Sequence, residues 1–126
     1  MDYEGLLDRG ETLFEKGDYQ SALLVFEEAI KLKENDFLQN YIGCCYLELN
    51  QHLEAIKVFL RVMDTNDTWE RPVMNLARVF FELSGEKEAF RLLRRARLLC
   101  PTSEDVYQLP ADHPERPRLE NEMRNG

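Results

Sequence analysis

The sequence predicts an all-α fold in which three antiparallel helix pairs stack as an α-solenoid. A small residue, an Ala twelve positions later and an aromatic or Leu four positions after that recur three times, with shifts of 33 and then 34 residues. The recurring residues are Gly10, Ala22 and Phe26, then Gly43, Ala55 and Phe59, then Ala77, Ala89 and Leu93. A fixed period of this size is typical of repeats that bury their apolar faces by stacking on neighbours. No segment shows the sustained two-residue alternation of a strand.

The first pair is predicted over residues 4–16 and 19–32. Leu6, Leu7, Leu13 and Phe14 follow helical spacing, and the Gly17-Asp18 dipeptide then ends the first helix. The second helix continues the helical spacing with apolar residues. These are Ala22, Leu23, Val25, Phe26, Ala29, Ile30 and Leu32.

The second pair is predicted over 37–49 and 53–64, broken at Asn50-Gln51, and the third over 70–83 and 86–99, broken at Ser84-Gly85. Pro72 falls in the first turn of its helix, where the missing N–H is tolerated. Pro101 follows the last helix as a terminator.

This pattern resembles the tetratricopeptide repeat, whose consensus has Leu-Gly, Tyr, Ala, an aromatic residue and Pro on a 34-residue period. The first copy matches through Gly10, Leu13, Gly17, Asp18, Tyr19, Ala22, Phe26 and Ala29; the second through Ile42, Gly43, Tyr46, Ala55 and Phe59; the third through Leu76, Ala77, Phe80, Ala89, Leu93, Ala96 and Pro101. The resemblance implies a right-handed superhelix. No copy has the early Trp of the consensus.

The repeats are assigned to residues 3–35, 36–69 and 70–103, which make one domain over 1–103. Residues 104–126 are expected to form a C-terminal capping segment or a flexible tail. The run Thr102 to Asp105 is able to cap a short helix, whereas Pro110, Pro114 and Pro117 forbid a long one.

Composition narrows the class of partner. The net charge of −8 argues against nucleic acid as the main partner. No apolar run approaches the length of a membrane helix, and the acidic start does not resemble a signal peptide. We therefore expect a protein partner and a cytoplasmic location. The three cysteines, two of them adjacent, do not form a disulfide framework and fit a reducing compartment.

In tetratricopeptide repeats the first helix of each pair lines a concave groove, and the resemblance carries the groove positions over by register. The expected partner-binding residues are Leu7, Glu11, Phe14, Phe37, Asn40, Tyr41, Cys44, Leu47, Arg71, Met74, Asn75, Arg78 and Phe81, with Glu4, Asp8, Glu15, Glu48 and Glu82 beside them. This groove has an apolar floor, an acidic end in the first repeat and a basic end in the third. The alternative is that several of these side chains pack against neighbouring helices.

Some family members hold a partner's terminal carboxylate with Lys, Asn and Arg side chains. Leu7, Glu11 and Tyr41 occupy the first three of those positions here, and Arg71 and Asn75 occupy the last two. Glu11 repels a carboxylate, so we do not expect a co-chaperone of that type.

No catalytic, cofactor-binding or metal-ligating residue is predicted. Cys44, Cys45 and His52 lack a fourth ligand, and successive helical residues point about 100° apart. Cys45 is expected to be buried and Cys44 to face the groove, so Cys44 should react first with a thiol reagent. No phosphate loop or nucleophile motif is present, which argues against an enzyme.

Two interpretations remain for the run Arg91, Arg94, Arg95 and Arg97, namely a solvated convex surface or a contact with an acidic partner or RNA. For the whole chain we expect a protein–protein interaction module that binds a peptide or helix, as adaptor or scaffold. The alternatives are a bacterial secretion chaperone that holds an apolar client segment, and a subunit that assembles with its own copy as a homodimer.

Overall fold

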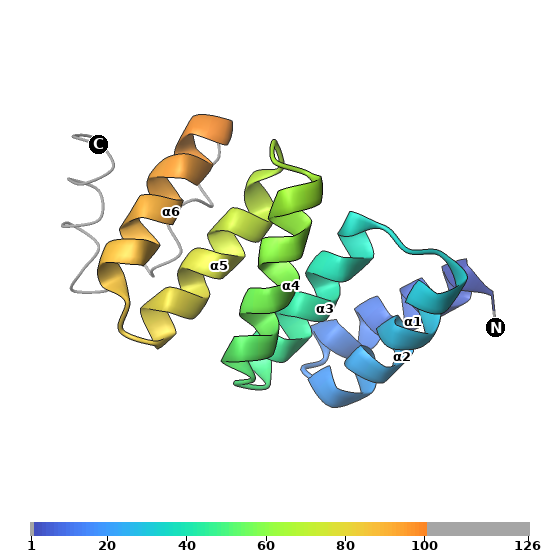
Figure 1. The fold of residues 1–126 in the computed structure, drawn as a ribbon. Helices are drawn as coiled ribbons and strands as arrows, with labels where there is room; N and C mark the ends of the chain where they lie inside the picture. Colours follow the sequence, from blue (N-terminus) through green and yellow to red (C-terminus); the bar gives the residue numbers. More distant parts are fainter. Residues whose placement is uncertain (1, 101–126) are drawn as a thin grey trace. The chain divides into compact units, whose positions relative to one another are not determined.

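Six helices make up the part of the chain that the structure, a computed structural model, describes, which is residues 2–100 (Figure 1). They are α1 (Tyr3–Glu15), α2 (Tyr19–Leu32), α3 (Asp36–Glu48), α4 (His52–Thr65), α5 (Glu70–Glu82) and α6 (Glu86–Leu99). Residues 2–100 contain no strand, so the all-α prediction is confirmed. Each predicted helix end agrees with the structure to within one residue.

The turn inside each pair is built in the same way. Gly17, Asn50 and Ser84 follow the first helices with φ of 81°, 60° and 64°, the left-handed conformation that ends many helices. The next residue then donates its N–H five residues back, as from Asp18 to the Leu13 carbonyl at 2.9 Å and from Gln51 to the Tyr46 carbonyl at 2.8 Å. These bonds satisfy carbonyls that a helix end leaves unpaired, and they reverse the chain in few residues.

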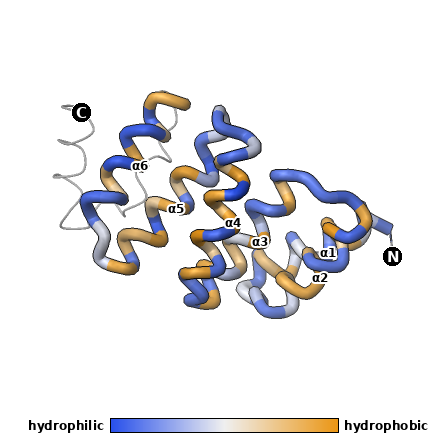
Figure 2. The backbone as a smooth tube through the Cα atoms, viewed as in Figure 1, coloured by the Kyte–Doolittle hydropathy of each residue, from blue (hydrophilic) through white to orange (hydrophobic). Residues whose placement is uncertain are grey.

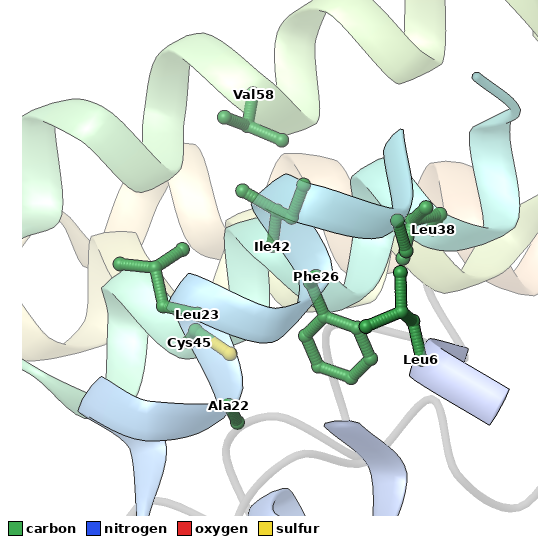
Figure 3. Packing of buried hydrophobic residues seen from close by; sticks show 9 residues of the cluster. Leu6, Ala22, Leu23, Phe26, Leu38, Ile42, Cys45 and Val58 are labelled. Atoms are coloured by element: carbon green, nitrogen blue, oxygen red, sulfur yellow. The ribbon is translucent and has the colours of Figure 1, made fainter. Parts of the chain in front are cut away.

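The described chain divides into two compact units, and each is treated by itself. Unit 1 (Met1–Asn66) contains α1 to α4, in which α1 pairs with α2, α3 pairs with α4, and α2 also packs against α3. Its core is shown in Figure 3 and includes the fully buried Ala22, Phe26 and Cys45.

Glycine lets the helices of unit 1 approach closely. A Cβ atom at Gly43 would lie 2.6 Å from Cε1 of Phe59, and one at Gly10 would overlap the ring of Phe26. Both rings are fully buried. The recurring Gly and Phe of the sequence are therefore a matched pair, in which the ring fills the space that the missing side chain leaves.

Unit 2 begins at Asp67 and holds α5 and α6, which pack against each other. Its buried cluster consists of Ala77, Ala89, Phe90 and Leu93. Pro72 lies in the first turn of α5, as predicted. Figure 2 shows hydrophilic and hydrophobic stretches alternating along α6, as expected of an amphipathic helix. Residues 104–126 and the predicted cap from Thr102 to Asp105 lie outside the described residues.

Candidate functional site

Four acidic residues form a row along one side of α1. Glu4, Asp8, Glu11 and Glu15 fall within about 60° of one another around the helix axis, because each residue turns the helix by about 100°. Three of them are exposed and Glu11 is partly buried. We call this set the α1 row.

The equivalent positions of α3, each 33 residues later, carry a different chemistry. Phe37, Tyr41, Cys44 and Glu48 form this α3 row, which is mainly aromatic and thiol-bearing. Phe37 is 49% exposed, and the other three are partly buried. The α1 row and the α3 row together are called the α1/α3 face below.

Tyr41 is the residue around which the aromatic side chains of unit 1 gather. Its ring stacks on the buried Phe26 with centroids 5.0 Å apart, and it meets Phe37 edge-on at 5.2 Å and Phe14 edge-on at 5.6 Å. Phe14 in turn contacts Tyr19 at 5.1 Å. Offset and edge-to-face pairs of this kind are favourable beyond their buried area. The exposed Phe37 ring is thus supported by rings that belong to the core.

The α1 row and Tyr41 also interact electrostatically. Burial raises the pKa of the Tyr41 phenol above its usual value, and the nearby carboxylates of Glu11 and Glu15 raise it further. This effect shows that the acidic row of α1 and the aromatic row of α3 lie within electrostatic reach of each other.

The two adjacent cysteines have the environments that the sequence predicts. Cys45 is fully buried and Cys44 only partly. Burial, followed by the neighbouring charges of Cys44, Glu27 and Glu48, raises the pKa of the Cys45 thiol to about 12. Because the thiolate is the reactive form, burial and the raised pKa both protect Cys45 from thiol reagents, and the earlier reaction of Cys44 stays a prediction.

Three of the expected groove residues are buried instead of surface-forming. Leu47 is 1% exposed, Met74 is fully buried, and Asn40 is 9% exposed. Their positions turn about 70–90° away from the centre of the row, which directs them inward. These three side chains offer no surface to a partner, so the interpretation that some groove positions are core residues is correct for them. Leu7 and Phe14, at the equivalent positions of α1, are partly buried against the core of unit 1.

In unit 2 the same register places Arg71, Asn75, Arg78 and Glu82 along α5, and all but the exposed Glu82 are partly buried. Arg78 Nε lies 3.5 Å from Glu82 Oε2. Phe81 is partly buried and meets Phe90 of α6 edge-on at 5.5 Å, so it packs against the core of unit 2. This α5 row is basic at its start and internally paired at its end.

Sequence reasoning missed two side-chain contacts of unit 1, one that joins its two helix pairs and one within the second pair. The Asn35 side chain accepts a 2.8 Å hydrogen bond from the Leu38 N–H, which caps α3, and its Nδ2 donates to the Tyr3 hydroxyl at 2.7 Å. Thr65 at the end of α4 donates to Asp36 at the start of α3, at 2.9 Å. An Asn directly before a helix is a recognisable cap signal, whereas its second bond to Tyr3 depends on tertiary structure.

Within residues 2–100, no three His, Cys, Asp or Glu side chains are grouped closely enough to hold a metal ion. The longest helices of this region have 14 residues, and none combines the length and hydropathy that a membrane span requires.

Solved structures of several helical repeat proteins resemble this chain. One is the Yersinia enterocolitica type III secretion chaperone SycD in complex with a peptide of the translocator YopD, with 18% identity and a TM-score of 0.76 over 97% of this chain and 89% of SycD. The Arabidopsis OM64 TPR domain has 19% identity and a TM-score of 0.78 over 98% of this chain and 94% of its own. The first TPR domain of Spaghetti (RPAP3), bound to the HSP90 peptide SRMEEVD, has 16% identity and a TM-score of 0.78 over 95% of this chain and 91% of its own.

A comparison with curated proteins gave no significant match. Two family models described as tetratricopeptide repeat match residues 3–36 and 40–67, which cover the two helix pairs of unit 1 except for residues 37–39 of α3. Together with the six helices and the recurring Gly, Ala and aromatic positions, these matches show that the chain is a tetratricopeptide repeat protein.

Proposed function

We propose that this protein is an interaction module whose α1/α3 face binds a segment of another protein, as an adaptor or scaffold. The observation that carries the proposal is the Phe37 ring, which stays about half exposed on a helix whose neighbouring rings are packed into the core. Large aromatic side chains at a surface often mark interaction sites and supply a large share of binding energy.

The face is also preorganised. Tyr41 is fixed by contacts with Phe14, Phe26 and Phe37, so little side-chain freedom remains to be lost when a partner docks. A module of this size that binds one segment is expected to reach micromolar affinity, roughly −8 kcal/mol. The proposal involves no catalytic step.

The structural neighbours support a segment as the partner. SycD is seen with a peptide of YopD, and RPAP3 with an HSP90 peptide. The neighbours share the fold of this chain and demonstrate that the fold accommodates a bound segment. At 18% and 16% sequence identity, the identity of the bound segment does not carry over from these neighbours to this chain.

A chaperone for an exported protein is the second candidate. Its support is that SycD, a type III secretion chaperone, has a similar fold, and that PcrH, also of similar fold, is seen with the chaperone binding region of PopB. A chaperone of this kind should co-purify with a single client that becomes insoluble or is degraded when the chaperone is absent. A scaffold module should be isolated alone and leave the level of its partner unchanged.

Self-assembly is the third candidate, and one SycD structure is a dimer. Light scattering over a range of concentrations separates it from the others, because a mass that stays monomeric removes it. The odd number of cysteines, two of them adjacent, supports a reducing compartment, such as the cytoplasm, as the place of action.

The central experiment compares two substitutions that each place a carboxylate on an exposed apolar position. Phe37→Glu alters the α1/α3 face, whereas Leu24→Glu alters α2, where Leu24 is 57% exposed. Affinity capture from the source organism, read by mass spectrometry, should recover the same partner with the wild type and Leu24→Glu, and lose it with Phe37→Glu. Circular dichroism checks that both variants fold. Equal recovery by all three proteins would contradict the proposed face.

A further inference from the structure

Resting on the proposed function, we infer that the α1/α3 face selects a cationic amphipathic segment, with apolar side chains on one side and Lys or Arg on the other. The apolar side is expected to pack on Phe37 and Tyr41 of the α3 row. The Lys or Arg side chains are expected to lie over the carboxylates of the α1 row.

The charge of the α1 row is not balanced by its own helix. Arg9 is the only basic residue of α1, and it points more than about 100° away from the row. Lys16 caps the end of the helix on the same averted side. The four carboxylates therefore present a uniformly negative strip along the helix.

The negative strip and the aromatic surface are adjacent. Phe14 of α1 touches Tyr41 of α3, and the charges of Glu11 and Glu15 act on the Tyr41 phenol. A segment that buries an apolar side chain against Phe37 must therefore bring its neighbouring residues close to these carboxylates. An acidic segment is repelled there, and a basic one is attracted.

The chemistry of Lys and Arg suits both rows at once. Their long aliphatic stems cover apolar surface while the charged end stays in contact with water and carboxylates, and their cations are attracted to aromatic faces. Unit 1 already contains one such contact, because Lys33 Nζ lies 5.4 Å from the centroid of the Tyr3 ring. The expected ligand thus differs in charge from the acidic SRMEEVD peptide bound by RPAP3.

A display experiment tests this inference and does not require the natural partner to be identified first. A random peptide library displayed on phage is selected against the full chain, with counter-selection against Phe37→Glu. Enriched peptides are then synthesised with a fluorescent label, and their affinities are measured by anisotropy for the wild type and two matched double variants.

The test variant is Glu11→Gln with Glu15→Gln, which removes two charges from the α1 row. The control is Glu28→Gln with Asp64→Asn, which removes two charges from exposed positions of α2 and α4. We expect enriched peptides to combine aromatic or aliphatic residues with Lys or Arg, and to bind the test variant about five- to tenfold more weakly, as the loss of two surface ion pairs predicts. The control variant should bind as the wild type does, and added salt should weaken binding.

The failure of the inference and the failure of the proposed function have different signatures. Peptides that require Phe37 but lack Lys and Arg, or that bind the Glu11→Gln, Glu15→Gln variant with full affinity, would overturn the charge selection and leave the binding face in place. A selection in which no peptide distinguishes the wild type from Phe37→Glu would overturn the proposed function itself.

Discussion

Unit 1 and unit 2 solve the same packing problem with different residues. In unit 1, Gly10 packs against Phe26 and Gly43 packs against Phe59. The equivalent positions of unit 2 hold Ala77 and Leu93, which are both fully buried in one cluster. Compared with unit 1, the residue on the first helix of the pair is larger by one carbon, Ala instead of Gly. The residue on the second helix is smaller, Leu instead of Phe. The comparison indicates that the repeat preserves the combined volume of the two positions rather than either residue.

The units differ in three further equivalent places. The buried Cys45 of α3 corresponds to the buried Val79 of α5, and Gly17 at the first turn corresponds to Ser84 at the third. Asn35 caps α3 with its side chain, whereas Trp69 stands before α5 without a side-chain cap bond. A substitution at each of these three places tests what the difference between the two residues contributes to stability.

The largest effect is expected from Cys45 in alkaline solution. Its pKa is raised from 9.0 to about 12 in the folded protein, so the unfolded chain loses the proton first as pH rises. The free energy of unfolding should be unaffected below about pH 9 and should then fall by about 1.4 kcal/mol per pH unit up to the folded pKa. Urea unfolding at several pH values measures this slope.

Cys45→Val introduces the residue that unit 2 has at the equivalent position. This variant should no longer show the fall in the free energy of unfolding that the Cys45 thiol causes in alkaline solution. Tyr41 and Tyr46, whose pKa values burial also raises, should leave a smaller slope at higher pH. An unchanged slope in Cys45→Val would show that the thiol is not the titrating group.

The next effect is the coupling between Gly43 and Phe59. Gly43→Ala should destabilise unit 1, because its Cβ overlaps a fully buried ring, and overpacking of this kind costs about 1–3 kcal/mol. Gly43→Ala combined with Phe59→Leu transplants the pair of unit 2. The double variant should lose less stability than the sum of the single variants, by about 1 kcal/mol or more. Additive losses would refute the shared-volume interpretation.

A smaller effect, about 1–2 kcal/mol, is expected for Asn35→Ala. This change removes the cap of α3 and the hydrogen bond to Tyr3 together. Asn35→Asp keeps the capping oxygen but loses the donor to the Tyr3 hydroxyl, so it should fall between the wild type and Asn35→Ala in thermal unfolding. If Asn35→Asp unfolds like the wild type, the bond to Tyr3 contributes nothing, whereas equal unfolding of Asn35→Asp and Asn35→Ala would mean that the cap contributes nothing.

The smallest effect concerns the turns. Ser84 has φ of 64°, which glycine adopts without the steric cost of a Cβ atom, so Ser84→Gly should stabilise unit 2 by about 1 kcal/mol or less. Gly17→Ala should destabilise unit 1, because Ala adopts a positive φ less readily, although no atom lies within 4 Å of the added Cβ. Calorimetry on the two variants measures how much the left-handed backbone conformation contributes to the free energy of unfolding.

The sequence was sufficient to predict the six helices, because the repeated small and aromatic positions and the turn residues are local signals. Cys45 was also correctly expected to be buried. Leu47 and Met74 were expected at the surface and are buried, because a position at the edge of a helix face becomes core or surface according to what packs beside it. The bond from Asn35 to Tyr3 spans 32 residues and has no periodic signature.

The way in which the helices of unit 1 are held together has a consequence for how such a protein changes during evolution. Gly10 with Phe26 holds α1 against α2, Gly43 with Phe59 holds α3 against α4, and Asn35 bonds to Tyr3; none of these residues belongs to the α1 row or the α3 row. The exposed members of the two rows are therefore free to be exchanged at small cost to stability, and a new ligand preference is accessible through a few surface substitutions. Unit 1 is accordingly a suitable scaffold for engineering, in which Glu4, Asp8 and Phe37 are the first positions to randomise.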